Sequence, residues 1–262
     1  MSFLEHQGRT LCYRLLGDPA KPLMLLAHPL GMNQTVWDEM LPALLGHFRT
    51  LTWDLPGHGS SSAWPEQAVT AADLAAEALT LAAVAGAERF HFVGTSIGGI
   101  IGQQLLCQAP ERLDSVTLTN TGAVIGTPEA WQLRAGNVRA RGLAAMAHEI
   151  VPRWFGAAAR EQQPALLAGW TVAMARGDAH SYAQLCEMLA GTDFRDTLGR
   201  PDVPIRLVAG ADDLATPPES LASLARITGA PSPEVLEHVG HVPSVECPER
   251  LAERLLRHPE RE

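Results

Sequence analysis

A Gly-x-Ser-x-Gly motif follows an apolar segment and precedes a helix-like segment near the middle of this chain. The serine is Ser96, with Gly94 before it and Gly98 and Gly99 after it, and the apolar segment is 90–93. A strand, a serine between small residues and a helix are together the context of a nucleophile elbow, a turn tight enough to strain the serine backbone. The motif is common by itself, so a plain Gly-rich turn is the alternative interpretation.

Segments typical of strands and segments typical of helices alternate along the chain. The predicted strands are 10–16, 22–27, 48–53, 90–93, 115–119, 205–208 and 235–238, and the predicted helices are 71–85, 100–109 and 248–257. Strands separated by helices of this length indicate a parallel sheet that is covered on both faces. Such sheets bind their ligands at the carboxyl ends of the strands, and every motif considered below falls at one of those ends.

The alternation stops between residues 122 and 199. This stretch lacks a clear strand pattern, and its apolar residues recur at helical spacing, as at Leu166 and Trp170. We therefore expect a core domain formed by residues 1–121 and 200–262, with residues 122–199 inserted as a helical cap over the site. A separate helical domain is the alternative, which the absence of linkers on either side disfavours.

Composition excludes several classes of protein. The 262 residues are 46% hydrophobic and 19% charged, as in ordinary globular proteins, and the net charge is −9. The absence of a basic cluster argues against nucleic acid or an anionic membrane as a partner. We find no secretion signal and no apolar run long enough to span a membrane. The cysteines lack C-x-x-C spacing, which is typical of reduced thiols in the cytoplasm and predicts no zinc site; they are Cys12, Cys107, Cys186 and Cys247.

Candidates for a catalytic acid follow the serine motif in the sequence. A serine hydroxyl is a weak nucleophile until a base takes its proton, and a third group must orient that base. The polar turn after the predicted strand 205–208 offers Asp213, whose carboxylate would leave the strand tip toward the base. Asp212 is the alternative, although aspartate is favoured in turns in any case. Asn120 ends another predicted strand, but its amide cannot act as the acid.

The candidate base is His241, which follows Gly240 in a loop after the predicted strand 235–238. His238 competes with it but lies within that predicted strand, where it would point according to the strand alternation. We favour His241, because the chain order serine, acid, histidine is then the one that this type of elbow requires.

The developing negative charge of acyl transfer needs two backbone N–H donors. One is expected from Ile97, directly after the serine at a helix N-terminus, where the helix dipole also helps. The second is expected from Leu30, in the loop 28–31 after an apolar strand. His28 in the same loop is a candidate for substrate contact, with a structural histidine as the alternative. The turn 54–59 is interpreted as loop architecture.

The chain resembles the α/β-hydrolase superfamily over nearly its whole length. The resemblance rests on the loop 28–31, the turn 54–59, the elbow 94–99, the turn 210–213 and the stretch 241–246. It implies an α/β fold with a mostly parallel, doubly wound sheet and a helical cap inserted after the sixth strand. It also implies a serine mechanism that uses no cofactor and no metal, in agreement with the absence of phosphate-binding, dinucleotide-binding and zinc motifs.

Within that superfamily the chain is similar to the 3-oxoadipate enol-lactonases of aromatic-compound degradation. The residues that carry this similarity lie around Leu30 and Trp37, at the cap entry 120–131, at 152–155 and at 209–217. The similarity implies a hydrolase that opens a small enol-lactone carrying a carboxylate. Trp131 and Trp154 on the predicted cap are candidates for lining the pocket.

The chain departs from the enol-lactonase pattern at three places. Arginine is common in that family where this chain has Pro56 and Val124, and Asn-Ser is common where it has residues 28 and 29. A carboxylate in a partly buried pocket is best held by a guanidinium, which forms paired, charge-assisted hydrogen bonds. Arg134 or Arg139 on the predicted cap would then supply the charge.

These observations lead to one main hypothesis about function. Ser96, His241 and Asp213 would form a triad that cleaves a small carboxylic ester or lactone through an acyl-enzyme, with the enol-lactone itself as the specific candidate substrate. The alternatives are a general carboxylesterase, a carbon–carbon bond hydrolase or perhydrolase on the same triad, and a non-catalytic homologue that binds a small molecule. The sequence contains no signal for a particular oligomeric state.

Overall fold

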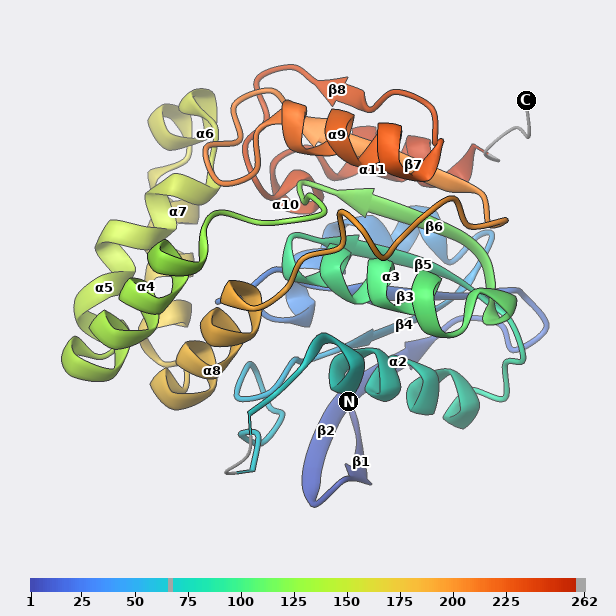
Figure 1. The fold of residues 1–262 in the computed structure, drawn as a ribbon, viewed down its shortest axis with the longest axis horizontal. Coiled ribbons are helices and arrows are strands. Elements are labelled where there is room, and N and C mark those ends of the chain that lie inside the picture. Colours follow the sequence, from blue (N-terminus) through green and yellow to red (C-terminus); the bar gives the residue numbers. More distant parts are fainter. Residues whose placement is uncertain (66–67, 258–262) are drawn as a thin grey trace.

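An eight-stranded sheet runs through the protein, whose computed structural model describes residues 1–65 and 68–257 (Figure 1). The strands lie in the order β1-β2-β4-β3-β5-β6-β7-β8, parallel from β4 to β8 and antiparallel among β1, β2 and β4. They are β1 (Ser2–His6), β2 (Arg9–Leu16), β3 (Leu23–Ala27), β4 (Arg49–Trp53), β5 (Phe90–Thr95), β6 (Leu113–Thr119), β7 (Ile205–Gly210) and β8 (Glu234–Leu236). The predicted, mostly parallel sheet is confirmed.

The strands differ from the prediction mainly at the two edges of the sheet. Sequence analysis missed β1, because this edge strand is largely exposed on both faces and so has no alternation of apolar and polar residues. The prediction for 235–238 was wrong at its end. The last strand, β8, stops at Leu236, and His238 lies beyond it with a positive φ of 63°.

Helices cover both faces of the sheet. In Figure 1, α2 (Ala71–Val84) and α3 (Ile97–Gln108) pack together in front of it, and α11 (Pro248–Leu256) lies behind it with α1 (Leu41–Leu44). The remaining helices of the core are α9 (Pro218–Thr228), α10 (Pro243–Glu246) and the 3-10 helices η1 (Gln34–Met40) and η2 (Pro110–Arg112). None of the helices in residues 1–65 and 68–257 is long and apolar enough to cross a membrane.

Three of the core helices were predicted, and their limits have local causes. A capping box between Thr70 and Asp73 starts α2 at the predicted residue, because each side chain accepts a hydrogen bond from the other's backbone. The next helix, α3, begins at Ile97, earlier than predicted, because it starts directly from the turn at Ser96.

A group of helices between β6 and β7 forms the predicted cap, which therefore follows the sixth strand. These helices lie together on the left in Figure 1, and α4 packs against α8. They are α4 (Pro128–Arg141), α5 (Leu143–Ile150), η3 (Val151–Trp154), α6 (Ala157–Gln162), α7 (Pro164–Ala175) and α8 (Ala179–Ala190). The cap limits of 122 and 199 stay a prediction, and the end of the predicted core domain, 258–262, lies outside the described residues.

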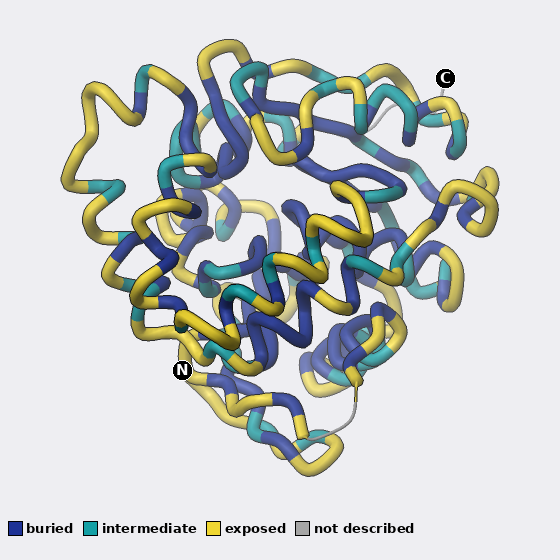
Figure 2. Tube along the Cα trace, turned by 60° about the vertical axis from the view of Figure 1, so that its left-hand side comes forward, coloured by how far each residue is buried: buried dark blue, intermediate teal, exposed yellow. Residues whose placement is uncertain are grey.

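The core lies along the central strands and the inner sides of the helices, which are the buried segments in Figure 2. All five residues of β3 are buried, and Leu25 and Leu26 are 0% exposed, as a strand covered on both faces requires. Burying one such leucine stabilises the fold by about 1.5–3 kcal/mol. Trp37 and Trp53 are also completely buried, so they belong to the core and not to a site.

Candidate active site

Ser96 occupies a strained turn between β5 and α3. Its φ of 59° and ψ of −117° lie in a region that residues other than glycine rarely adopt. The neighbouring glycines are required by close packing: a Cβ at Gly94 would lie 2.1 Å from the Gly98 oxygen, and one at Gly98 would lie 2.3 Å from the Ala27 oxygen. The serine is 6% exposed at the N-terminus of α3. This is the geometry of the predicted elbow.

Asp213 and His241 meet at the carboxyl end of the sheet. Oδ2 of Asp213 lies 2.8 Å from Nδ1 of His241, and both side chains are buried. Asp212 instead accepts a hydrogen bond from the backbone of Ala157 at 3.2 Å, and the exposed His238 lies outside this pair. The geometry therefore favours Asp213 and His241 over their two competitors.

Two further side chains hold the Asp213 carboxylate. Oδ2 accepts hydrogen bonds from Nδ2 of Asn120 at 2.8 Å and from the Thr216 hydroxyl at 2.7 Å. Burial opposes ionisation of this carboxyl, but the charge of His241 and these hydrogen bonds outweigh it and hold the pKa of Asp213 well below its usual range. Sequence reasoning considered Asn120 only as an acid and did not find Thr216, which carries no motif of its own.

The loop that carries His241 is tied to the cap. The His241 amide donates to the Trp154 carbonyl at 2.8 Å, and the Glu246 carboxylate accepts from the amides of Gly156 and Gly240 at 2.8 and 2.9 Å. Burial raises the pKa of Glu246 to about 7, although these hydrogen bonds act in the opposite direction. Contacts with the cap therefore fix the backbone of the loop that carries the His241 imidazole.

The structure places one of the two predicted oxyanion donors directly after Ser96 and the other in the wall of its cavity. Ile97 is the first residue of α3, and Leu30 lines the same cavity as Ser96 and His241. The neighbouring Gly31 amide is engaged, because it donates to Nε2 of His58 at 3.0 Å. Within residues 1–65 and 68–257, neither the Leu30 nor the Ile97 amide donates a hydrogen bond, so both remain available for an oxyanion.

His28 does not line the cavity, which corrects the expectation that it contacts the substrate. The side chain is 0% exposed; Nδ1 bonds the Pro29 carbonyl at 2.8 Å, and Nε2 accepts from the Leu55 amide at 3.0 Å. Burial lowers the pKa of His28 to about 4, so the ring is neutral at ordinary pH. It is the structural histidine that sequence analysis kept as the alternative.

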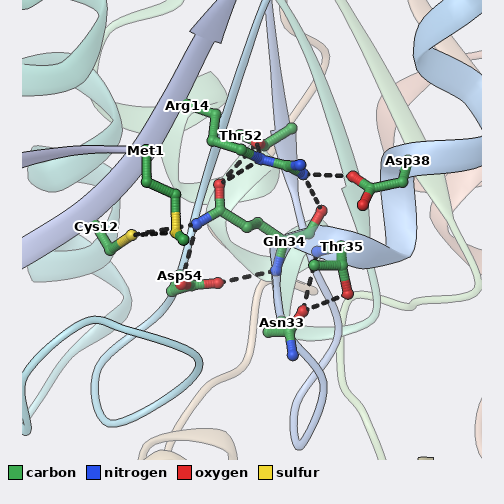
Figure 3. A network of polar contacts seen from close by, with 9 residues as sticks. All are labelled: Met1, Cys12, Arg14, Asn33, Gln34, Thr35, Asp38, Thr52 and Asp54. Atoms are coloured by element: carbon green, nitrogen blue, oxygen red, sulfur yellow. Dashed lines mark hydrogen bonds and ion pairs between the residues drawn. The ribbon is translucent and has the colours of Figure 1, made fainter.

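Asp54, at the start of the turn after β4, bonds Gln34, as Figure 3 shows. Its carboxylate accepts from the backbone and the side-chain amide of Gln34, both at 2.9 Å, and from the Ser60 amide at 2.9 Å. Arg14 holds the other side of Gln34 and pairs with Asp38. The segment after the loop 28–31 is therefore held against the turn 54–59, which supports the interpretation of that turn as loop architecture.

A cavity of about 150 Å³ lies between the elbow and the cap. Its catalytic side is formed by Ser96, His241 and Leu30, and its cap side includes the predicted residues Trp131, Arg134 and Trp154. Arg153 and Tyr182 are among the lining residues that the sequence did not predict. The first directly precedes a tryptophan that was predicted, whereas the second could be found only from the packing of α8.

Among the described residues, two arginines and no carboxylate line this cavity. The Arg134 guanidinium lies over the Trp131 ring, 5.4 Å from its centroid, and beside Tyr182. In the described part of the chain neither Arg134 nor Arg153 forms an ion pair. Arg139, the other candidate from the sequence, does not line the cavity and pairs with Glu187 on the outside of the cap.

Known proteins share this arrangement of sheet and cap. The chain matches the model of the alpha/beta hydrolase family over residues 24–254. It is 32% identical over 246 residues to 3-oxoadipate enol-lactonase 2 of Acinetobacter baylyi, covering 94% of this chain and 91% of that protein.

Solved structures of related hydrolases are also similar to this chain over almost its whole length. The enol-lactonase from Burkholderia xenovorans LB400 has a TM-score of 0.91 at 31% identity, covering 97% of this chain and 98% of that one. A malate-bound thermophilic esterase from Thermogutta terrifontis has a TM-score of 0.87 at 25% identity, covering 97% and 94%.

The family match includes the elbow, the acid turn and the histidine loop, and the relatives resemble this chain over almost all of their own length. This protein is therefore an enzyme that hydrolyses ester-type bonds, and it belongs to the alpha/beta hydrolase family.

Proposed function

We propose that the enzyme cleaves a small carboxylic ester or lactone through an acyl-enzyme, with Ser96 as the nucleophile, His241 as the base and Asp213 as the group that orients the base. The observation that carries this proposal is the 2.8 Å contact between Asp213 and His241 beside a cavity that Ser96 also lines. A buried carboxylate on Nδ1 leaves Nε2 of the imidazole to exchange protons with the serine.

The reaction follows from these positions. Ser96 Oγ bonds to the carbonyl carbon while His241 takes the hydroxyl proton, and the Leu30 and Ile97 amides hold the resulting oxyanion. The bond to the leaving oxygen then breaks, and His241 passes its proton to that oxygen. Water attacks the acyl-enzyme, giving its proton to His241, which returns it to Ser96 as the acid is released.

The substrate that we propose carries a carboxylate, and 3-oxoadipate enol-lactone is the leading candidate. Arg134 and Arg153 supply two guanidiniums at the cavity without a neighbouring carboxylate to neutralise them. They replace from the cap the arginines that enol-lactonases commonly have at the positions of Pro56 and Val124. The names of the enol-lactonase relatives and the malate bound to the related esterase support a small anionic substrate.

Two measurements test the proposal. Ser96→Ala is expected to lower turnover of a small aryl ester by at least about 10³-fold, and a fluorophosphonate is expected to label the native protein at Ser96. Unchanged turnover in the variant would exclude the serine mechanism. Ligand binding without labelling would indicate a non-catalytic binding protein.

A panel of lactones and aryl esters, each with and without a carboxylate, tests the substrate class. We expect kcat/KM to favour the anionic members by about tenfold or more, or about 1.4 kcal/mol in activation free energy. Equal values would identify a general carboxylesterase. Product analysis on the same panel separates lactone opening from carbon–carbon bond cleavage and from perhydrolysis.

A further inference from the structure

A second buried histidine, His58, holds the loop that carries the predicted oxyanion donor. The imidazole is 6% exposed and belongs to the turn after β4, while the loop follows β3. Its Nε2 accepts from the Gly31 amide at 3.0 Å, and its Nδ1 lies 2.8 Å from the Pro56 carbonyl. A carbonyl can only accept, so Nδ1 carries the proton and the ring is the neutral tautomer. Burial also lowers the pKa of His58, which favours that neutral form.

The bond to Gly31 controls which amide of the loop is free. Leu30 and Gly31 have successive N–H groups, and Leu30 lines the cavity. Because His58 takes the Gly31 N–H, the peptide unit after Leu30 is fixed and cannot rotate toward a bound oxyanion. His28 fixes the preceding unit, since its Nδ1 bonds the Pro29 carbonyl. In a trans peptide the C=O and the following N–H point in opposite directions, so that bond orients the Leu30 amide.

His58 also contacts the cap side of the site. Its ring stacks on Tyr182 of α8, with centroids 6.5 Å apart and an interplanar angle of 29°. The backbone of its turn meets α8 as well, because the Asp178 amide donates to the Gly57 carbonyl at 3.4 Å. A Cβ added at Gly31 would lie 3.1 Å from the Tyr182 ring. The imidazole therefore joins three parts of the site: the oxyanion loop, the turn after β4 and the cap.

We propose that His58 is a positioning residue that preorganises the oxyanion hole by holding Gly31, so that the Leu30 amide alone of the two faces the reacting carbonyl. The proposal rests on the serine mechanism proposed above. His58 takes no part as base or substrate ligand, because both ring nitrogens are occupied and the side chain does not line the cavity. Its effect falls on the transition state, since the bound ground-state ester has no oxyanion.

Three substitutions of His58 separate its hydrogen bond with Gly31 from its hydrogen bond with Pro56. His58→Leu removes both hydrogen bonds. His58→Asn places its amide near the position of Nδ1, so it can still donate to the Pro56 carbonyl but does not reach Gly31. His58→Gln places an acceptor near the position of Nε2, within reach of the Gly31 amide. His148→Leu removes an exposed imidazole from the cap and is the control.

We expect His58→Leu and His58→Asn to lower kcat for 4-nitrophenyl acetate by about 10- to 100-fold with KM changed less than about twofold, because a misplaced donor affects only the transition state. The affinity of phenylboronic acid, which forms a tetrahedral adduct with serine, should fall in parallel. His58→Gln should recover most of kcat and of the boronate affinity. If the leucine variant does not fold, the comparison of the asparagine and glutamine variants still tests whether the hydrogen bond to Gly31 is needed.

Equal kcat and equal boronate affinity in the asparagine variant and the native enzyme would overturn the proposal. So would losses of equal size in the asparagine and glutamine variants, which would indicate a merely structural role. Fluorophosphonate labelling of the native protein at Ser96 keeps the two proposals apart. Without labelling the serine mechanism itself fails, whereas with labelling an unaffected asparagine variant removes only the role of His58.

Discussion

Nδ2 of Asn120 donates a hydrogen bond to Oδ2 of Asp213 at 2.8 Å, although the two residues are 93 positions apart. Asn120 directly follows β6, Asp213 follows β7, and these strands are parallel neighbours, so their carboxyl ends meet at one edge of the sheet. The same side chain donates to the Gly240 carbonyl at 3.0 Å, directly before His241. One amide thus holds both the proposed acid and the loop of the proposed base.

We expect Asn120→Ala to lower kcat about tenfold, or about 1.4 kcal/mol in activation free energy, because the carboxylate that orients His241 loses a donor and moves more freely. Thr216→Val should act in the same direction, since it removes the other side-chain donor to Oδ2. Steady-state kinetics on a small aryl ester measure both effects. Full activity in both variants would show that the remaining contacts of Asp213, with His241 and with the backbone amides of Ala215 and Thr216, are sufficient to hold it.

The two arginines of the cavity give a prediction about substrate charge. Arg134→Met and Arg153→Met should each lower kcat/KM for anionic esters by about tenfold and change the value for neutral esters less than about twofold, because only a carboxylate gains from the paired hydrogen bonds. Arg139→Met is the matched control, since Arg139 lies on the same helix as Arg134 but pairs with Glu187 outside the cavity. Equal losses on neutral and anionic esters would contradict charge recognition.

Because His28 is buried in its neutral form, we expect the free energy of unfolding to fall in acid. Its folded-state pKa of about 4 lies below the ordinary value of 6.5, so the unfolded chain binds a proton more readily. The stability that it contributes is complete above pH 6.5 and is lost as the pH falls toward 4. From pH 7.5 to pH 5 this corresponds to about 2 kcal/mol.

Urea unfolding at these two pH values measures the effect of His28. His28→Asn keeps a donor near the Pro29 carbonyl but does not titrate, so the difference between its stabilities at the two pH values should be smaller than in the native protein by about that amount. His58 contributes in the same direction in both proteins, because its pKa is also lowered by burial. An identical pH dependence in both proteins would show that His28 is not buried in its neutral form.

The packing at the elbow predicts opposite results for two glycines. Gly98→Ala would place a Cβ 2.3 Å from the Ala27 oxygen, whereas the same change at Gly136 in α4 meets no atom within 4 Å. We expect the first to destabilise the protein by about 1–3 kcal/mol and to abolish most activity. The second should stabilise it by about 0.5–1 kcal/mol. Thermal unfolding and esterase assays of both variants check this, and similar stabilities would contradict the close packing.

Most of the sheet and the elbow at Ser96 could be read from local patterns. The continuous apolar residues of β3 and the Thr70 to Asp73 capping box are signals between chain neighbours, so a linear sequence contains them. The edge strand β1 has no such pattern, because both of its faces are largely exposed. The early start of α3 was missed because a strained serine, and not an ordinary N-cap, precedes it.

The chain by itself determined the elbow at Ser96 and the order of serine, acid and histidine, because these depend on residue type and spacing along the chain. Only the tertiary structure decided that Asp213 and not Asp212 contacts His241, that Asn120 and Thr216 hold the acid, that His28 is structural and that Arg153 lines the cavity. The physical reason is that these contacts join residues on different strands and on the cap. They depend on the register of neighbouring strands and on how the cap helices pack against the core. No local sequence pattern encodes either of these.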